Sequence, residues 1–277
     1  MKLKKEVKYG FAFIVLVALY ICFIFINNLT QIKGHKPTIN APSTVLEVSV
    51  KDKESALLEG ITAQDDEDGS LTDEIFIESI SAFDDNQQRT VTYAVFDSDD
   101  HLLRTTRQIK YTDYTAPVIN IKKALYTYYY LGTSEGYKDY VSASSSVDGD
   151  ISSVVTVDKV YIKDDISYID YSVTDSCGTK STLTLKGDIL SKTPNIEITL
   201  KNYLKRVKVG TTITEIAPLS NIKDIELMGM KNNTLKSAVE ITNDYNPNEP
   251  GMYEFVYRIS KSNGDYGITK LVVIVEE

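Results

Sequence analysis

Cysteine is scarce in this chain of 277 residues, which contains two, Cys22 and Cys177. Cys22 lies inside a long apolar run and Cys177 stands alone far beyond it, so the two are not expected to pair. Without a disulfide framework, the folded part must be stabilised by its own hydrophobic cores. Cys177 is expected to be a small, partly buried thiol, as free cysteines usually are.

Histidine and the motifs of common enzymes are also scarce. The chain has two histidines, His35 and His101, and neither lies in a recognisable catalytic motif. It lacks G-x-S-x-G, H-E-x-x-H, a glycine-rich phosphate loop and a cysteine pair at metal-binding spacing. A pair of carboxylates that cleaves glycosides has no such motif, so the sequence leaves this activity open. We nevertheless expect no enzyme activity, no catalytic residue and no cofactor, because none of these motifs is present.

Positive charge is in the minority. The chain has 30 Lys and Arg against 39 Asp and Glu, which gives a net charge of −9. Nucleic acid recognition needs a basic face, so nucleic acid is not an expected partner. The same balance argues against docking of the folded part on anionic lipid.

One long hydrophobic run is present, at residues 11–26, without a charged residue. With Tyr9 and Gly10 it just enters the range of about 17–25 residues for a helix that crosses a bilayer. The run is apolar on every face, which argues against a core helix of a soluble domain. A cleaved signal peptide is an open alternative, but no A-x-A cleavage pattern follows the run.

The lysines around the run predict its orientation. Four precede it, whereas Lys33 and Lys36 lie close behind it. The positive-inside rule therefore predicts a cytoplasmic N-terminus and an extracellular C-terminal part, as in a single-pass protein of the cell membrane. We expect a tail at residues 1–8, an anchor at residues 9–27 and a linker at residues 28–36.

From residue 37 onward the pattern changes to β-strands. Apolar and polar residues alternate over residues 46–50, 91–95, 169–173 and 253–259, and a closing strand is expected at 270–275. Period-two alternation is typical of half-buried strands. No long helical periodicity is found beyond the apolar run, and 19 tyrosines fit β structure. The sequence therefore predicts an all-β fold.

An internal repeat organises this part of the chain. Three markers recur in one order, 80, 80 and 78 positions later: Pro37 as Pro117, Asp68 and Gly69 as Asp148 and Gly149, and residues 93–97 as residues 171–175. Pro194 opens a third, more diverged copy without the Asp-Gly pair. We expect three sandwich modules, at residues 37–115, 116–193 and 194–277. Modules joined by X-Pro without a spacer predict a stiff rod.

These residues resemble the bacterial surface immunoglobulin-like repeat, which is found in cell-wall proteins and insecticidal crystal proteins. Matches to its motifs fall in all three copies: Gly60, Ala63, Asp65, Asp68 and Gly69; Asp148, Gly149 and Asp150; Tyr253, Tyr257 and Gly264. Lys261 stands where the family usually has Asp. The resemblance implies three tandem immunoglobulin-like β-sandwiches that serve as stalks, spacers or adhesion modules, without catalytic residues.

An acidic turn is the first candidate site. Clustered carboxylates on a loop can bind Ca²⁺, so the candidate ligands are Asp65, Asp66, Asp68 and, if it folds back, Asp113. The cluster does not fit an EF-hand loop. The alternative is that the Asp-Gly pair simply forms a turn in which Gly supplies a positive φ.

A tyrosine run is the second candidate site. In a strand, Tyr126, Tyr128 and Tyr130 would share one face and could contact a sugar or a protein. The alternative is ordinary packing in a strand.

Three functions are left open by the sequence. The first is a membrane-anchored structural or adhesive ectodomain, with the diverged third module as its contact surface. The second is an accessory subunit of a secretion or wall-assembly complex in the cell envelope. The third is a binder of wall polysaccharide. The expected partners are thus the membrane, through residues 9–27, and a protein or wall glycan, through the ectodomain.

Overall fold

The computed structural model describes residues 15–26, 34–127 and 136–277, except residues 165 and 191. Residues 15–26, the described part of the apolar run, form an exposed helix. Among the described residues, no helix combines the length and the hydropathy needed to span a membrane. The anchor therefore stays a prediction.

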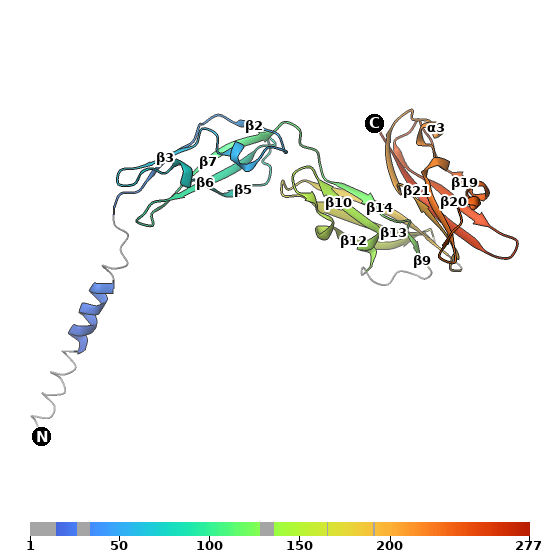
Figure 1. Ribbon diagram of the computed structural model, residues 1–277, viewed down its shortest axis with the longest axis horizontal. Coiled ribbons are helices and arrows are strands. Elements are labelled where there is room, and N and C mark those ends of the chain that lie inside the picture. The colour runs from blue at the N-terminus through green and yellow to red at the C-terminus, as the bar shows by residue number, and fades with distance from the viewer. Residues whose placement is uncertain (1–14, 27–33, 128–135, 165, 191) are drawn as a thin grey trace, which may run out of the picture. The chain divides into compact units, whose positions relative to one another are not determined.

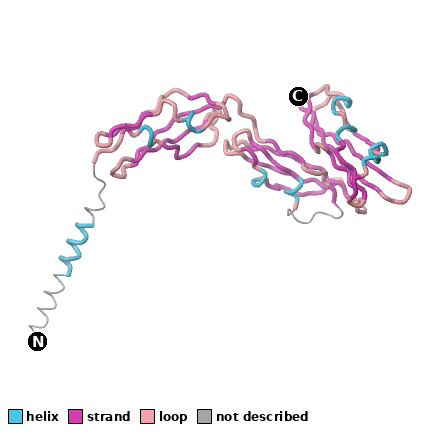
Figure 2. The backbone as a smooth tube through the Cα atoms, in the orientation of Figure 1, coloured by secondary structure: helices cyan, strands magenta, loops and turns pink. Residues whose placement is uncertain are grey.

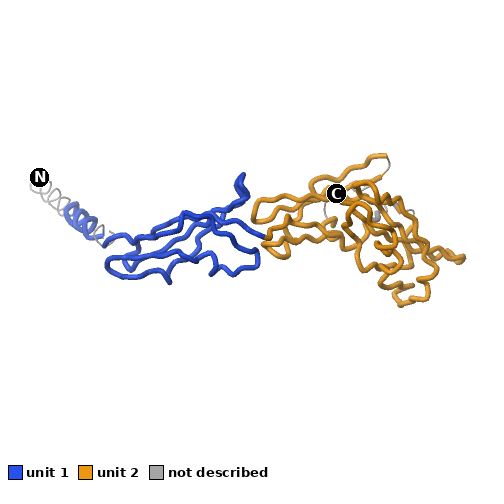
Figure 3. The backbone as a smooth tube through the Cα atoms, turned by 90° about the horizontal axis from the view of Figure 1, so that it is seen from above, with its two compact units in different colours: residues 1–112 blue, residues 113–277 orange. Residues whose placement is uncertain are grey.

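The chain divides into two compact units, residues 1–112 and residues 113–277 (Figure 3). The elements of the first unit beyond its N-terminal helix are β1 (Thr38–Asn40), β2 (Leu46–Val48), α2 (Glu54–Leu57), β3 (Thr62–Asp65), β4 (Gly69–Ser70), η1 (Thr72–Glu74), β5 (Phe76–Ile80), β6 (Arg89–Phe96) and β7 (Leu102–Tyr111) (Figure 1).

The second unit contains two successive sets of strands. The first set comprises β8 (Val118–Ile121), β9 (Tyr126–Thr127), η2 (Tyr137–Tyr140), β10 (Val141–Ser145), β11 (Gly149–Asp150), η3 (Ser152–Val154), β12 (Thr156–Lys163), β13 (Ile166–Thr174) and β14 (Lys180–Ile189). The second set comprises β15 (Ile196–Leu200), β16 (Leu204–Lys208), α3 (Ile213–Ile216), η4 (Leu219–Asn221), β17 (Ile222–Leu227), β18 (Met230–Lys231), η5 (Asn233–Ala238), β19 (Glu240–Asn243), β20 (Gly251–Ser260) and β21 (Tyr266–Glu276).

Strands are the main regular structure of the described chain beyond residue 37 (Figure 2), which confirms the predicted all-β class. Each set of strands forms a three-stranded and a four-stranded sheet, which we call the first, second and third sheet pairs. Their strand orders are β1-β3-β4 with β2-β7-β6-β5, β11-β10-β8 with β12-β13-β14-β9, and β15-β17-β18 with β16-β21-β20-β19. Each pair encloses a hydrophobic cluster of its own.

A fully buried tyrosine occupies the same place in every pair. Tyr93 on β6 donates a hydrogen bond from its hydroxyl to the Leu57 carbonyl at 2.6 Å. Tyr171 on β13 and Tyr257 on β20 donate in the same way, each at 2.9 Å, to the carbonyls of Tyr137 and Pro218. In each pair, the bond joins the penultimate strand to the short helical segment that precedes β3, β10 or β17. The three copies therefore share one internal tyrosine hydrogen bond.

The Asp-Gly turns of the first two pairs are tight turns, and the third pair keeps the turn without the aspartate. Gly69 and Gly149 have φ of 77° and 71°, a region that glycine adopts without strain. In the third pair, Met228 and Gly229, with φ of 52° and 76°, occupy the turn between β17 and β18. The repeat is therefore more complete than the sequence suggests.

A second turn, between the last two strands, is also shared. In it Asp97, Asp175 and Lys261 donate backbone N–H groups to His101, Thr179 and Asp265. This register places Lys261 at the position of the two aspartates, as the motif of the repeat predicts.

The second and third sheet pairs are packed together rather than joined only end to end. Val272, on β21 of the third pair, belongs to the hydrophobic cluster of the second pair, and Ile274 packs against the same cluster. Leu271 and Val273, the alternate residues of that strand, lie in the third pair's cluster. Because β21 is covered on both faces, its sequence is almost uninterruptedly apolar. The second and third sheet pairs are therefore held together by side-chain packing as well as by the chain that connects them.

Candidate binding surface at the junction of the second and third sheet pairs

A buried lysine connects the two sheet pairs. Lys270 on β21 is 2% exposed. Its Nζ donates to the Lys186 carbonyl at 2.6 Å, to Asp188 Oδ2 at 3.1 Å and to Glu254 Oε1 at 2.8 Å. An ammonium has three protons to donate, so these acceptors satisfy it completely, and two of them come from β14 of the second pair.

Glu254 is the centre of the same cluster. It is 9% exposed and lies on β20, next to Lys270 on β21 and to Lys186 on β14. Burial alone would lower the pKa of Lys186, but the carboxylates of Glu254 and Asp188 raise it above its usual value. The cluster therefore places two lysines and two carboxylates in contact across the junction.

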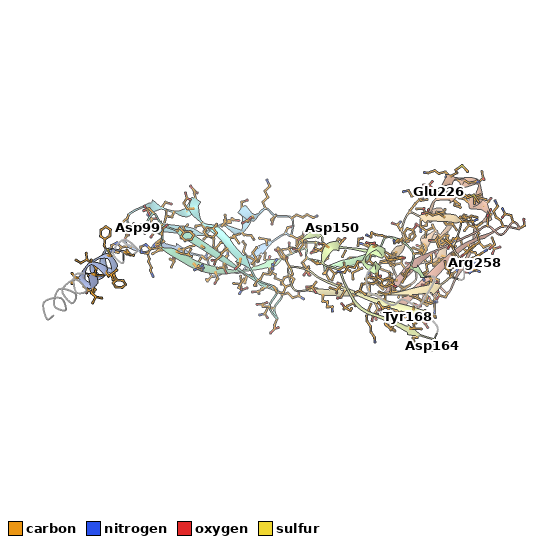
Figure 4. All side chains as sticks on the ribbon, turned by 90° about the horizontal axis from the view of Figure 1, so that it is seen from below. Asp99, Asp150, Asp164, Tyr168, Glu226 and Arg258 are labelled. Carbon is orange, nitrogen blue, oxygen red and sulfur yellow. The ribbon has the colours of Figure 1, made fainter. Side chains whose placement is uncertain are left out.

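A small cavity of about 400 Å³ lies beside this cluster. Its walls come from both sheet pairs and include Ile166, Tyr168, Met252 and Glu254. Tyr168, labelled in Figure 4, stacks on Tyr161 with ring centroids 5.3 Å apart. An apolar pocket with an aromatic ring and a few polar groups is a common form of binding site.

A second cleft, of about 540 Å³, opens where the three-stranded sheets of the two pairs meet. The second pair contributes the end of β8 with Lys122 and Lys123, and the third pair contributes β15, Lys201 and Lys223. One acidic residue, Glu197, also lines it. In a chain with excess negative charge, this cleft is locally basic.

Two further clefts border the third sheet pair. One, of about 390 Å³, continues from the basic cleft along Tyr203 and reaches Glu226. The other, of about 400 Å³, is lined by Lys192, Arg258 and Lys261 together with Asp265. The third pair, predicted to be the contact surface, thus borders all four clefts described here.

In the predicted acidic turn, Asp65 and Asp68 each accept hydrogen bonds from backbone N–H groups. Asp65 Oδ1 accepts hydrogen bonds from the N–H groups of Glu67 and Asp68, at 2.8 and 3.0 Å. Asp68 Oδ2 accepts from the Ser98 N–H at 2.8 Å, and Asp148 accepts from the Ser176 N–H at the same distance. These bonds tie each turn to the hairpin of the opposite sheet, which is a structural role.

The structure does not bring the four candidate calcium ligands together within one compact unit. Asp66 is an exposed residue of the turn, and Asp113 falls in the other compact unit. Within the described residues, no group of three or more His, Cys, Asp or Glu side chains is placed to hold a metal ion. Asp65 Oδ2 is buried without a hydrogen-bond partner.

The predicted tyrosine face falls largely outside the described residues. Tyr126 forms β9, which pairs in parallel with β14. Tyr128 and Tyr130 lie in the stretch 128–135, which the structure does not describe. Their proposed contact with a ligand stays a prediction.

Cys177, which was expected to be a partly buried thiol, is buried in the structure. Cys177 is 1% exposed, in the hairpin turn of the second pair, whereas both histidines belong to the first unit. His101 Nδ1 lies 2.6 Å from Asp97 Oδ2 within a turn. Burial alone would raise the pKa of Asp97, but hydrogen bonds from His101 and Asp99 outweigh it and lower this pKa.

The junction residues were not predicted from the sequence, although one signal was present. A lysine directly before an apolar run, as Lys270 is before residues 271–275, can mark a buried cation that needs partners. Its partners, Glu254 and Asp188, lie on other strands, and only the fold brings them together.

No protein-family model matches the chain, and a search of curated proteins gives no match. Among solved structures, CBM51-2 with INT domains of Clostridium perfringens ZmpB, in complex with GlcNAc, is 18% identical with a TM-score of 0.23 and covers 55% of this chain. This chain covers 42% of that protein, which is less than half of its length. Human CDH23 EC21-23 is 10% identical with a TM-score of 0.22, over 87% of this chain and 100% of that one. At these scores the similarities carry no argument about function.

Proposed function

We propose that this chain is a membrane-anchored cell-surface protein of bacterial type, whose three immunoglobulin-like modules hold and present a binding surface and carry out no reaction. The anchor is residues 9–27, and the binding surface is the junction of the second and third sheet pairs. The observation that carries the proposal is the concentration of four clefts, between about 390 and 540 Å³, along the third sheet pair.

The buried charge cluster supports this proposal because it joins the two sheet pairs whose residues line the clefts. A binding site formed by two modules needs a defined geometry between them. The buried Lys270 provides one at the junction, because it donates hydrogen bonds to the Lys186 carbonyl and to Asp188 of the second pair. The ligand would thus meet a preformed surface.

The binding part is tested by retention on isolated cell wall. Residues 37–277 include every described strand and all three hydrophobic clusters, so this fragment contains the complete β-sandwiches. We expect retention of the fragment by cell wall or by whole cells. A fragment of residues 37–112 is the control, because it has the first sheet pair and none of the four clefts. Equal retention of both fragments, or of neither, would contradict the proposal.

The anchoring part is tested separately. Full-length chain should fractionate with membranes, and replacing residues 11–26 by an unrelated apolar helix should leave both membrane association and surface binding unchanged. Loss of function after this exchange would favour a subunit of an envelope complex whose helix makes specific contacts.

A further inference from the structure

The basic cleft departs from the charge of the whole molecule. The chain has 30 basic against 39 acidic residues, but four lysines and one glutamate line this cleft. All four lysines are exposed, as is Glu197. Clefts lined by charges of one sign concentrate ligands of the opposite sign.

The four ammonium groups are not neutralised by ion pairs within the described part of the chain, where the recorded pairs involve other lysines. Lys123 Nζ lies over the ring of Tyr140, 4.3 Å from its centroid. Lys122 is near enough to Asp150 to lower the pKa of that carboxyl, whose larger lowering influence is the hydrogen bonding of Ser152. The cleft thus keeps a positive field.

The backbone that carries these lysines is well anchored. The Lys122 N–H donates to the Tyr140 carbonyl and the Lys201 N–H to the Asn221 carbonyl, both at 2.8 Å. The residues that directly precede these two lysines, Ile121 and Leu200, are buried in the hydrophobic clusters of the second and third pairs. The cleft therefore combines exposed lysines with a backbone that is fixed by hydrogen bonds and by buried apolar neighbours.

We propose that this cleft binds a flexible polyol chain linked by phosphodiesters, a proposal that rests on the proposed function and names its ligand class. Lysine acts as a compact point charge toward phosphate, whereas planar carboxylates are best matched by the fork of arginine, which this cleft lacks. The carbon segments between phosphates would contact the half-buried Tyr203 and Leu204. An acidic peptide fits this combination less well.

The test uses the full-length chain in an uncharged detergent and a synthetic oligo(glycerol phosphate) as the probe, with affinity measured by titration. We expect binding that weakens as salt is added, because exposed charges are screened. The variant Lys122→Gln, Lys123→Gln, Lys201→Gln and Lys223→Gln should bind about tenfold or more weakly. An oligoglutamate of equal charge should bind more weakly than the phosphate chain.

A matched control removes four exposed lysines elsewhere, by Lys51→Gln, Lys53→Gln, Lys110→Gln and Lys163→Gln. It changes the net charge equally and should bind the probe as the unmodified chain does. Equal loss in both variants, or no loss in the cleft variant, would overturn the proposal. Equal or tighter binding of oligoglutamate, or tighter binding of an oligothymidylate, would also overturn it.

These outcomes are separable from those of the cell-wall experiment. If the chain is retained on cell wall but does not bind the probe, the ligand class is wrong and the binding function stands. If it binds the probe in the cleft but no wall or cell retains it, the function at the surface is wrong.

Discussion

The last strands of the first and third sheet pairs are equivalent in topology and different in environment. β7 pairs in parallel with β2, and β21 pairs in parallel with β16. On β7 buried residues are separated by exposed or half-buried ones, whereas residues 269–273 of β21 are all buried. A repeat can therefore keep its fold while one of its faces changes from solvent contact to packing against a neighbour.

The largest expected effect comes from breaking the buried charge cluster. Lys270→Ala removes the ammonium that Glu254 and Asp188 share, and should lower the free energy of unfolding by about 3 kcal/mol, because the buried Glu254 carboxylate loses the nearer of its two lysine partners. Denaturant unfolding of the full-length chain in uncharged detergent measures this change. The control is Lys110→Ala on β7, an exposed lysine, for which we expect a change within about 0.5 kcal/mol. Similar losses for the two variants would contradict the comparison.

The next effect tests what the copies share. Tyr93→Phe, Tyr171→Phe and Tyr257→Phe each remove one hydroxyl that donates to a backbone carbonyl. Each should lower the free energy of unfolding by about 1–2 kcal/mol, the usual loss for a buried hydrogen bond. Tyr253→Phe, at an exposed bond to Glu249, should have a smaller effect in the same unfolding measurement. If only one copy depended on this hydrogen bond, one variant would lose much free energy of unfolding and the other two almost none.

The acidic turn gives a smaller effect. Asp68→Ala and Asp148→Ala each remove the carboxylate that accepts a backbone N–H from the opposite hairpin. We expect each to lower the free energy of unfolding by about 1 kcal/mol. We expect the turn not to bind calcium, because Asp65 and Asp68 accept backbone hydrogen bonds. Millimolar calcium should then leave the melting temperature unchanged, whereas binding to the folded state would raise it. A rise that chelator reverses would support the prediction of a calcium site.

The smallest effect compares two carboxylates at equivalent bulges. Glu78 on β5 bonds to Arg104, and Asp158 on β12 bonds to Thr156, Ser172 and Lys180. The hydrogen bonds lower the pKa of Asp158 to about 2, and the bond to Arg104 lowers the pKa of Glu78.

A carboxyl whose pKa is lower in the folded state stabilises the fold above its unfolded pKa of about 4. For Asp158 this contribution should therefore be lost as pH falls from about 4 toward 2. Asp158→Asn should flatten the decrease of melting temperature over this pH window. An unchanged pH profile in this variant would show that the other acidic residues account for the decrease.

The β-sandwich pattern was predictable because it is local. Period-two alternation placed residues 91–95, 169–173 and 253–259 within β6, β13 and β20. The Asp-Gly pairs predicted turns, which the positive φ of Gly69 and Gly149 confirms. By contrast, the missing Asp-Gly pair made the third copy look more diverged than it is, because Met228 and Gly229 form the same turn.

The binding surface was not predictable in the same way. The sequence directed attention to acidic and aromatic clusters that are contiguous in the chain. The fold instead assembles its clefts from residues far apart, such as Lys122 and Lys223, or Tyr168 and Met252. No local pattern records which strands of two modules will meet.

By itself, the sequence determined the class of fold, the repeat and its turns, because alternation and glycine conformation act over a few neighbouring residues. The tertiary structure alone decided that the second and third sheet pairs join through β21 and the buried Lys270. The physical reason is that packing and charge pairing between distant strands depend on distances in space, which are set only once the chain has folded.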